Sequence, residues 1–453
     1  MSSITETTSS AMPDENTKTA PCAEILPSST ENPYDNTRYR NYVLFMLTMA
    51  YAFNFIDRQI LVILQESIKQ ELLLSDAQLG LLTGIAFAFF YVMMGIPVAR
   101  LADKWVRRNI MSIAISTWSF FTAISGFAQN YTQLLLARIG VGVGESGCSP
   151  PAHSMISDMY PAEKRGTALS IYSLGINIGV LFGFLLGGWI NEFFGWRVAF
   201  IVVGVPGILI GILIQTTIKE PIRGARDAIE KVEDAVSFKE SIKTLWSKKS
   251  FRHISLGASC LALIAYGSAI WFAPYMLRNF DIQTGELGTW LALISGILGG
   301  AGTLYGGYLA DKKGVQDKRW YIWIPAVSAA IALPFLFLVY MLDELYLVLC
   351  LFAIPATMAT VYMGPSLAMV QGLVNVRMRA LASAILFFAI NILGLGLGPV
   401  LVGIISDQLS ADFGTRSVGY AVLGVSVVFS IIAIWQFLAA GKYINEEMES
   451  AKG

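Results

Sequence analysis

The sequence predicts an all-α membrane protein of twelve transmembrane helices, arranged as two pseudo-symmetric six-helix bundles. Three observations support this fold class. The composition is apolar, twelve apolar stretches have the length needed to cross a bilayer, and short motifs recur at matching places in the two halves of the chain. A chain of this kind is solvated by lipid over most of its length.

The composition is that of a membrane protein. Of 453 residues, 55% are hydrophobic and 14% are charged, whereas a soluble protein carries about 25% charged residues. The net charge is zero and basic residues do not gather with aromatic ones, so nucleic acid is not an expected partner. The four cysteines form neither a disulfide framework nor a metal-binding spacing. We therefore predict no metal site, no cofactor and no catalytic residues.

A helix needs about 20 apolar residues to cross a bilayer, and twelve stretches meet that length. They fall six and six around a charged segment, Ile218 to Ser250. We expect a tail at 1–38, an N-terminal bundle at 39–218, a linker at 219–250, a C-terminal bundle at 251–441 and a tail at 442–453. The expected spans are about 41–65, 78–99, 109–128, 133–157, 165–190, 196–217, 251–277, 287–310, 320–341, 345–371, 379–405 and 416–440.

The positions of Lys and Arg predict the orientation, because these residues gather in cytoplasmic loops. Of the 32, the tails and the loops after even-numbered spans hold 26, and only Lys69, Arg197, Arg278 and Arg416 lie on the opposite side. Both termini are therefore expected in the cytoplasm. Residues 1–37 are polar, lack the apolar core of a signal peptide and predict a disordered tail. Short outer loops favour a bacterial inner (cell) membrane.

Short motifs repeat between the two halves. The run Leu101-Ala102-Asp103-Lys104 after the second span recurs as Leu309-Ala310-Asp311-Lys312 after the eighth. The run that begins at Arg165 after the fourth span recurs at Arg379 after the tenth, with similar offsets of 208 and 214 residues. Parallel repeats of six spans are a known transporter plan, in which the substrate site lies between the halves near the membrane midplane.

On these residues the chain resembles the major facilitator superfamily over about 39–441. The matching features are the two Asp-Lys loops, the run Arg138-x3-Gly142-x-Gly144 and the glycines of the fifth span. The first loop departs from the family pattern, because Ala99 and Val106 stand where the second loop has Gly307 and Gly314.

Within that superfamily the chain resembles the Spinster family of lipid transporters. The segments that carry this likeness are Asn54-Phe-Ile-Asp57-Arg58, Arg138-Ile-Gly-Val-Gly-Val-Gly-Glu145 and Ser157-Asp158-Met-Tyr-Pro161. The resemblance implies transport of sphingosine-1-phosphate or lysophospholipids, often linked to protons.

Four charged residues lie inside predicted spans: Asp57 and Arg58 in the first, Arg138 and Glu145 in the fourth. Each costs about 2.5–3.5 kcal/mol on insertion scales, and such residues are functional by default. Arg138 and Glu145 are seven residues apart, so they share one helix face about 10 Å apart in height. Asp57 is expected near the height of Arg138, whereas Asp57 and Arg58 point about 100° apart and cannot face the same way.

The preferred interpretation of these charges is a proton-coupled gate. Burial raises the pKa of a carboxyl group and a nearby guanidinium lowers it, so motion that separates such a pair loads a proton. We expect Asp57 to be the first proton carrier and Glu145 the second, with Arg138 holding a phosphate or carboxylate through bidentate bonds. Arg58 has either a cavity role or a structural one. The alternative is that all four merely neutralise one another and fix the first and fourth spans together.

The C-terminal half offers aromatic rings and amides in place of buried charges. A cavity with one charged wall and one aromatic wall suits an amphiphile, its head toward Arg138 and its tail toward the second half. The alternative for each ring is packing or lipid contact. The residues predicted to bind substrate on this side are Tyr266, Trp271, Tyr362, Phe388 and Asn391.

The two repeated cytoplasmic loops predict a latch that holds the inner gate closed when the protein opens outward. Its residues are Asp103, Arg107 and Arg108 in the first half, with Asp311 and Lys312 in the second. A solvated charged face explains either loop alone. In the linker, apolar residues from Phe238 to Trp246 recur at helical spacing and predict an amphipathic interfacial helix, with a solvated linker as the alternative.

The preferred hypothesis is therefore a secondary transporter that moves a lysolipid- or sphingolipid-like amphiphile by alternating access, coupled to protons through Asp57 and Glu145. The alternative keeps the fold and changes the cargo to a small organic anion, such as an aromatic carboxylate, held by Arg138. An enzyme is not expected, because the sequence offers no nucleophile–base pair. The expected partners are the bilayer, the substrate and protons, and the protein is expected to act as a monomer.

Overall fold

The structure, a computed structural model, describes residues 32–226, 238–375 and 378–449, and within these ranges all regular structure is helical. This confirms the predicted all-α class. Most of the predicted N-terminal tail (1–31), part of the linker (227–237) and the chain end (450–453) lie outside the described residues.

The first half of the chain contains a short 3-10 helix and seven α-helices. The caps follow the sequence: the Asn36 side chain accepts the backbone N–H groups of Arg38 and Tyr39 at the start of α1, and Ser75 forms a capping box with Gln78 at the start of α2. The elements are η1 (Pro33–Asp35), α1 (Thr37–Leu72), α2 (Asp76–Thr83), α3 (Ile85–Lys104), α4 (Arg107–Ser125), α5 (Tyr131–Glu145), α6 (Ser149–Met159) and α7 (Ala162–Thr217).

The second half includes two π-helical segments, which the sequence did not predict. One of them, Ile390–Leu397, coincides with the glycine cluster before Pro399. The elements are α8 (Phe238–Ser247), α9 (Lys249–Asn279), α10 (Thr284–Leu291), η2 (Ala292–Leu298), α11 (Gly299–Gly314), α12 (Trp320–Met341), α13 (Leu345–Val361), α14 (Met363–Gly372), α15 (Arg379–Ala389), η4 (Ile390–Leu397), α16 (Gly398–Phe413), η5 (Gly414–Arg416) and α17 (Ser417–Glu449).

Within the described residues, eight helical stretches are long and apolar enough to cross a membrane. Two of them are much longer than one crossing, namely α7 with 56 residues and 381–444 with 64. The third and fourth predicted spans coincide with α4 and with the α5–α6 pair. This arrangement is consistent with the twelve predicted spans if each long stretch crosses twice.

The helix α7 reverses direction at Gly195, whose φ of 83° belongs to the region that favours glycine. Before this point, Gly175 packs on Thr48 and Gly187 packs on Ile63, so α7 runs parallel to α1. After it, Gly204 packs on Ala123 and Gly211 packs on Ser112, so the second leg runs antiparallel to α4. The second leg ends beside the start of α1, since the Tyr42 and Thr217 hydroxyls lie 2.7 Å apart.

The last long stretch reverses at Gly414, where φ is 55°. Its first leg runs parallel to α9, because Gly394 packs on Ala262 and Gly403 packs on Trp271. Its second leg, α17, runs antiparallel to α9, because it begins beside Tyr275 and reaches Gly257 at Phe437. Both long stretches therefore hold two legs each.

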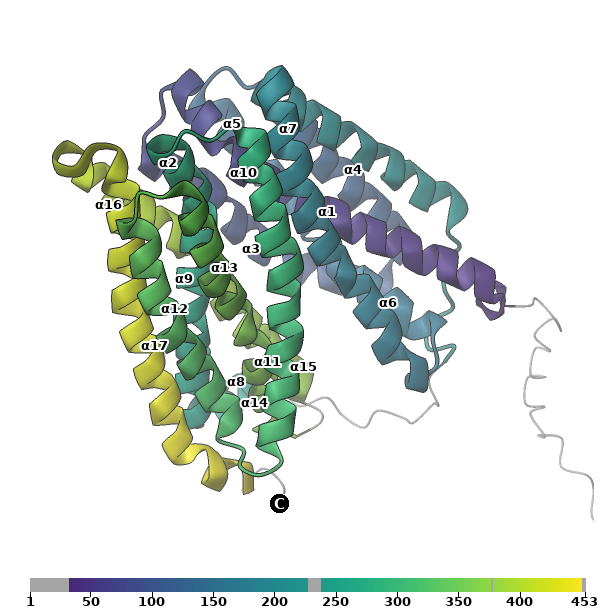
Figure 1. The fold of residues 1–453 in the computed structure, drawn as a ribbon. Helices are drawn as coiled ribbons and strands as arrows, with labels where there is room; N and C mark the ends of the chain where they lie inside the picture. The colour runs from purple at the N-terminus through teal and green to yellow at the C-terminus, as the bar shows by residue number, and fades with distance from the viewer. Residues whose placement is uncertain (1–31, 227–237, 376–377, 450–453) are drawn as a thin grey trace, which may run out of the picture.

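The helices form two bundles, α1–α7 and α9–α17, that meet at one end of the molecule and diverge toward the other (Figure 1). We call the end with η1, the start of α4 and the end of α17 the tail face, and the end with Leu73, Gly195 and Gly414 the far face.

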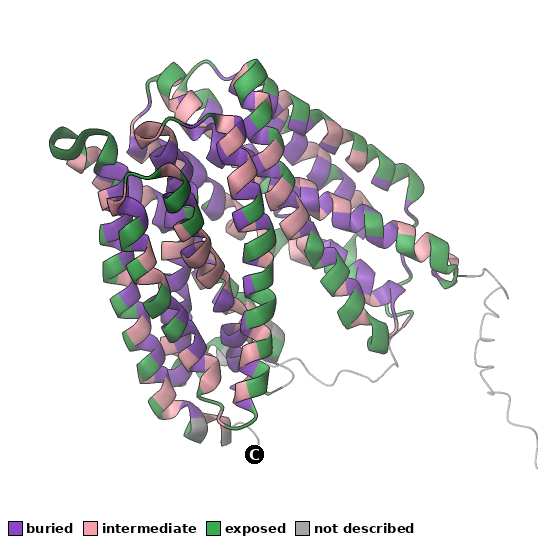
Figure 2. Ribbon diagram, viewed as in Figure 1, coloured by how far each residue is buried: buried purple, intermediate pink, exposed green. Residues whose placement is uncertain are grey.

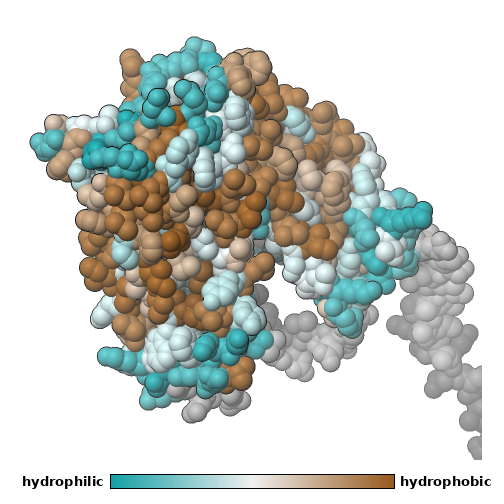
Figure 3. Space-filling view, in the orientation of Figure 1, coloured by the Kyte–Doolittle hydropathy of each residue, from teal (hydrophilic) through white to brown (hydrophobic). Residues whose placement is uncertain are grey.

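Buried positions gather where helices face one another, and exposed ones lie along the outside (Figure 2). Apolar side chains cover the middle of the molecule, polar ones gather at its two ends, and the surface is hollowed between the bundles at the tail face (Figure 3).

Buried charge joins the two bundles at the far face. Arg278 of α9 binds Glu66 of α1 at 2.7 Å and both oxygens of Asp76 of α2 at 2.8 and 2.9 Å. Ser406 donates to Asp76 at 2.6 Å, and the carboxylate of Asp407 accepts the backbone N–H groups of Asp76 and Ala77. An acidic side chain from one bundle thus caps the N-terminus of a helix in the other, where the helix dipole favours negative charge.

Close backbone contacts complete this closure. An added Cβ at Gly188 would lie 2.5 Å from the Thr284 carbonyl oxygen, and one at Gly288 would lie 2.4 Å from that of Phe184. On the other side of the interface, an added Cβ at Gly80 would lie 2.5 Å from the Pro399 carbonyl oxygen. Only glycine permits such approaches, so the far face of this state is closed by packing as well as by charge.

Replacing Arg278 should open the far face. Removing one partner of a buried pair costs about 3–5 kcal/mol, because the other charge stays buried. In Arg278→Ala, spin labels at the exposed positions Gln70 and Asp412 should therefore show a new population at longer distance, measured by pulsed electron resonance in a background without the native cysteines. Arg416→Ala removes an exposed pair with Asp343 and should leave the distribution unchanged. Identical distributions for both variants would contradict this account of the closure.

Candidate functional site

The centre of the N-terminal bundle holds an ion pair between Arg58 of α1 and Glu145 of α5. The Nε of Arg58 donates to Oε2 of Glu145 at 2.7 Å. The Glu145 side chain is fully buried, whereas 15% of the Arg58 side chain is exposed. Arg58 is therefore the partly exposed member of the pair, and the Glu145 carboxylate is the buried one.

Three aromatic rings surround the Arg58 guanidinium. Its central carbon lies 4.9 Å from the ring centres of Phe55 and Phe87 and 4.8 Å from that of Tyr91. Phe87 and Tyr91 stack on each other one turn apart on α3. A desolvated cation gains attraction from each ring face, so the rings hold the guanidinium in place without saturating its hydrogen-bond donors.

A break in the fourth span places Glu145 at a helix end. The helix α5 stops at Glu145, and α6 starts at Ser149 with prolines in its first turn, where proline is tolerated. Glycines of α5 permit close packing on both sides, since an added Cβ at Gly142 would lie 2.9 Å from the Phe87 carbonyl oxygen and one at Gly144 would lie 2.6 Å from the Trp118 nitrogen. Broken helices at midplane are typical of transporter sites.

The other two charges lie deeper in the bundle. Asp57 and Arg138 are each only 2% exposed. Oδ1 of Asp57 and both Nε and Nη1 of Arg138 lack a hydrogen-bond partner within the described chain. Three charged groups lie close enough to interact with the Asp57 carboxyl group, namely Glu145, Arg138 and Arg58. The structure thus brings all four predicted charges together, and it pairs Arg58 with Glu145 rather than Asp57 with Arg138.

The predicted residues of the C-terminal bundle lie in different environments. Tyr266 of α9 interacts electrostatically with Arg58 across the two bundles, and Tyr362 neighbours Tyr266. Trp271 is fully buried and donates its indole N–H to the Pro399 carbonyl at 2.9 Å. Phe388 is exposed, and Asn391 donates to the Phe387 carbonyl of its own helix at 2.8 Å. Of this group, Tyr266 is the residue that the structure couples to the charged pair.

Comparison with known proteins identifies the family. A model of the Major Facilitator Superfamily matches residues 47–395. The chain belongs to this superfamily.

Within the superfamily, the chain is a Spinster-type transporter. Among solved structures, a bacterial homologue of the human lysosomal transporter Spinster, in an inward-facing and unoccupied conformation, superposes with a TM-score of 0.82. The two proteins are 31% identical, over 90% of this chain and 98% of that one.

Three curated relatives are transporters rather than enzymes. An MFS-type efflux pump of Mycolicibacterium smegmatis is 29% identical over 410 residues, which cover 90% of this chain and 94% of that protein. A sphingosine-1-phosphate transporter of Danio rerio is 26% identical over 90% of this chain and 85% of that protein. A probable galactarate/D-glucarate transporter of Bacillus subtilis is 26% identical over 61% of this chain and 67% of that protein. This Spinster-type protein is therefore a multi-pass membrane transporter.

On the tail face of this transporter, Arg107 holds the first repeated loop to the start of the linker. The side chain is 1% exposed, and it donates to Asp158 at 2.5 Å, to Glu220 at 2.7 Å and to the Pro221 carbonyl at 2.8 Å. Arg223 donates to backbone carbonyls at the end of α3, at Ala102 and Trp105 as well as at Asp103.

Of the other predicted latch residues, Arg108, Asp311 and Lys312 contact residues of their own bundle. Asp103 is exposed, and the Arg108 side chain donates to the Ile218 carbonyl at 3.1 Å. Asp311 accepts the Tyr321 hydroxyl at 2.8 Å, and Lys312 lies over the Tyr308 ring. The latch therefore remains a prediction for the state in which the tail face closes. Sequence reasoning noted the run that contains Asp158 but missed its pairing with Arg107, because the two residues come from different spans.

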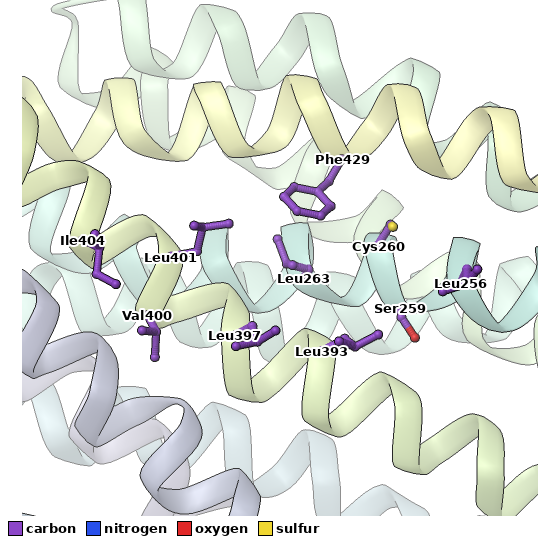
Figure 4. Close-up of a pocket in the computed structure, with 10 residues that line it drawn as sticks. All are labelled: Leu256, Ser259, Cys260, Leu263, Leu393, Leu397, Val400, Leu401, Ile404 and Phe429. Atoms are coloured by element: carbon purple, nitrogen blue, oxygen red, sulfur yellow. The ribbon is translucent and has the colours of Figure 1, made fainter.

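An apolar groove lies in the C-terminal bundle between α9, η4, α16 and α17 (Figure 4). Its volume is about 260 Å³. No charged side chain and no residue of the N-terminal bundle is among the described residues that line it. Its lining consists of Leu256, Ser259, Cys260, Leu263, Leu393, Leu397, Val400, Leu401, Ile404 and Phe429.

Replacing Arg107 should destabilise the N-terminal bundle. Arg107→Ala leaves the carboxylates of Asp158 and Glu220 without their guanidinium, and breaking a buried pair in this way costs about 3–5 kcal/mol. The adjacent Arg108→Ala is the matched control, because it removes two hydrogen bonds to neutral oxygens, of Ile218 and Asn109, each worth about 1 kcal/mol. Thermal unfolding of both variants in detergent measures the difference. Equal melting temperatures for the two would contradict the structural role of Arg107.

Proposed function

We propose that this Spinster-type transporter moves a lysolipid- or sphingolipid-like amphiphile by alternating access, with protons as the coupled ion. One observation supports the site assignment above all: Arg58 is caged by three rings and one carboxylate, yet part of its side chain remains exposed. A guanidinium recognises phosphate and carboxylate groups through paired N–H donors. The Arg58 guanidinium can therefore bind an anionic head group.

Arg58 thereby takes the head-group role expected of Arg138, whereas the sequence had predicted Arg58 as a further substrate-binding residue or a structural one. Arg138 is 2% exposed and faces Phe87 at 5.7 Å, so a head group would need to displace the Arg58–Glu145 pair to reach it. Arg138 instead contributes a second positive charge behind the pair. That charge favours an anion at Arg58 without touching it.

Binding of an anion at Arg58 competes with Glu145 for the same donors. The site holds two guanidinium groups and two carboxylates, Asp57 and Glu145, so its net charge is zero when all are ionised. When the head group takes the Arg58 donors, Glu145 loses its partner in a buried setting. A carboxylate without a partner in low dielectric binds a proton more readily, and the proton restores neutrality to a site that holds a monoanion. Anion binding and proton uptake are thereby coupled, with Asp57 as the second proton-binding group.

The opposite wall suits a hydrocarbon tail. Tyr266 of α9 neighbours Arg58, and Phe387 and Phe388 of α15 are exposed apolar rings of the C-terminal bundle. The curated sphingosine-1-phosphate transporter supports a cargo with one anionic end and one apolar end.

The cycle follows from the closure of the far face. In the state described here the bundles diverge at the tail face, which lets an amphiphile reach Arg58 from the predicted cytoplasmic side. Release on the other side requires the contacts of Arg278 with Glu66 and Asp76 to break and the predicted tail-face latch to form. We propose that Asp103, Arg107, Arg108, Asp311 and Lys312 stabilise that second state.

A second candidate cargo is a small organic anion. The same guanidinium binds a carboxylate without requiring a tail, and the galactarate/D-glucarate relative supports this alternative. The two candidates differ in whether an acyl chain contributes to affinity.

Ligand binding should distinguish these candidates and the two arginines. We expect sphingosine-1-phosphate or a lysophospholipid to bind the purified protein saturably, measured by thermal shift, and benzoate or glucarate to bind weakly. Arg58→Ala should abolish binding, and Arg58→Lys should weaken it, because an ammonium lacks the planar fork. Arg100→Ala, at an exposed position on α3, is the control and should bind as the wild type does. If only the small acids bind, the cargo is a small organic anion and not an amphiphile.

Asp57→Asn should remove the response to a pH gradient. The amide is similar in size but cannot take up a proton, so transport into proteoliposomes driven by a pH gradient should fall to the level seen without one. Exchange of labelled for unlabelled substrate at equal pH should continue. An unchanged gradient response in this variant would reject Asp57 as a proton carrier.

A further inference from the structure

A set of buried polar atoms without partners lies behind the Arg58–Glu145 pair. Three spans contribute to it: α1 through Asn54 and Asp57, α4 through Trp118 and Thr122, and α5 through Arg138 and Glu145. Each of these residues is at most 2% exposed. The unpartnered atoms within the described chain are Asn54 Oδ1 and Nδ2, Asp57 Oδ1, Trp118 Nε1, Thr122 Oγ1, Arg138 Nε and Nη1, and Glu145 Oε1.

These residues form one neighbourhood. Thr122 and Arg138 interact with the Asp57 carboxyl group, and Asn54 interacts with Glu145. Trp118 lies one helical turn before Thr122 on α4 and packs against Gly144, next to Glu145. The two carboxylates and the amide, hydroxyl and indole groups between them therefore line a common interior region of the N-terminal bundle.

Donors and acceptors are nearly balanced in this region. The N–H donors come from Arg138, Trp118 and Asn54, the acceptors come from Asp57, Glu145 and Asn54, and the Thr122 hydroxyl can serve as either. Thr122 and Asn54 lie close enough to the Asp57 and Glu145 carboxyl groups to satisfy them in part, but the N–H groups of Trp118 and Arg138 have no partner within the described chain. A buried polar group without a partner costs about 1–3 kcal/mol, so a folded protein does not retain several such groups unsatisfied. Water satisfies such mixed sets, because each molecule both donates and accepts.

A bound metal cation does not fit the same set. A cation would satisfy the oxygen atoms but would leave the four N–H donors unpaired, and the positive charges of Arg58 and Arg138 would repel it. An anion would satisfy the donors but would face Asp57 and Glu145. Water is the occupant that the whole set accepts.

We propose that these side chains hold a cluster of bound water that connects Asp57 to Glu145 and carries a proton between them. This inference rests on the proposed proton coupling and adds the path. Asn54 and Thr122 are positioning residues, since they hold the water and do not take the proton. In one transfer the O–H bond of the Asp57 carboxylic acid breaks, a proton moves along the water chain, and an O–H bond forms on the Glu145 carboxylate, with no change in net charge.

The charges around this path are fixed by the surrounding helices. Arg58 and Arg138 face the two carboxylates from α1 and α5, while Tyr91 of α3 and Tyr266 of α9 face Arg58. When a head group occupies Arg58, Glu145 becomes the better proton acceptor, and the proton taken up on binding enters at Asp57 and passes through the water cluster to Glu145. The path thereby couples binding at Arg58 to the proton held by Asp57.

The test removes the water-binding groups and keeps the carboxylates. Thr122→Val and Asn54→Leu, reconstituted as the full chain, should lower transport driven by a pH gradient about tenfold, the effect of losing one well-placed hydrogen bond of a buried group. Equal-pH exchange and thermal-shift binding of sphingosine-1-phosphate should stay within about twofold of wild type. Thr122→Ser should restore gradient-driven transport. Ser112→Ala, which removes a buried α4 hydroxyl that donates to the Gly211 carbonyl, is the matched control and should behave as wild type.

Three results would overturn the inference. In the first, Thr122→Val and Asn54→Leu leave gradient-driven transport unchanged while Asp57→Asn abolishes it, which rejects the water path and keeps the proposed function. In the second, the variants lower exchange and gradient-driven transport equally, which shows a structural role alone. In the third, wild-type transport responds to a sodium gradient and not to a pH gradient, which rejects the proposed coupling and the path together.

Discussion

The organising constraint in this transporter is the ion pair between Arg58 and Glu145 in the interior of one bundle. Burying either charge alone is expensive, and the pair tolerates burial because each partner compensates the other. The surrounding structure serves this pair: the rings of Phe55, Phe87 and Tyr91 fix the guanidinium, and the break after Glu145 puts the carboxylate at a helix end. In the proposed mechanism an anion competes with the Glu145 carboxylate for the donors of Arg58. The strength of the ion pair then sets how substrate and proton affect each other's binding.

The charged network at the far face holds the two bundles together on the side opposite the open tail face. Arg278, Glu66, Asp76 and Asp407 join the two bundles with charge that is largely buried, and glycine contacts bring the backbones together beside them. Such an interface is bistable, because partial separation would expose unpaired charges without solvating them fully. In the proposed cycle the bundles move as units, and the proposed substrate site opens to one side at a time.

Much of this architecture was predictable from the sequence. Apolar stretches predicted the spans, the tandem motifs predicted two related halves, and the high insertion cost of Asp57, Arg58, Arg138 and Glu145 identified the residues at the centre. The partner of each charge was not predictable, because a rotation of α1 by about 100° brings Arg58 to the direction of Asp57 or the reverse. The far-face pairs were also missed, since Asp76 and Arg278 lie about 200 residues apart in the chain and neither occupies a repeated motif. Trp271 was expected at the substrate, but its indole donates to the Pro399 carbonyl, a contact that no spacing rule predicts.

The most direct test of the central claim is the number of protons taken up when the anion binds. Isothermal titration of the purified protein with sphingosine-1-phosphate, in buffers of different ionisation enthalpy at one pH, gives that number. Displacement of Glu145 from Arg58 predicts an uptake of about one proton per bound anion, since the linkage of binding to protonation is set by the carboxylate that loses its partner. Glu145→Gln should bind with no such uptake. Tight binding by the wild type with no proton taken up in any buffer would contradict the account.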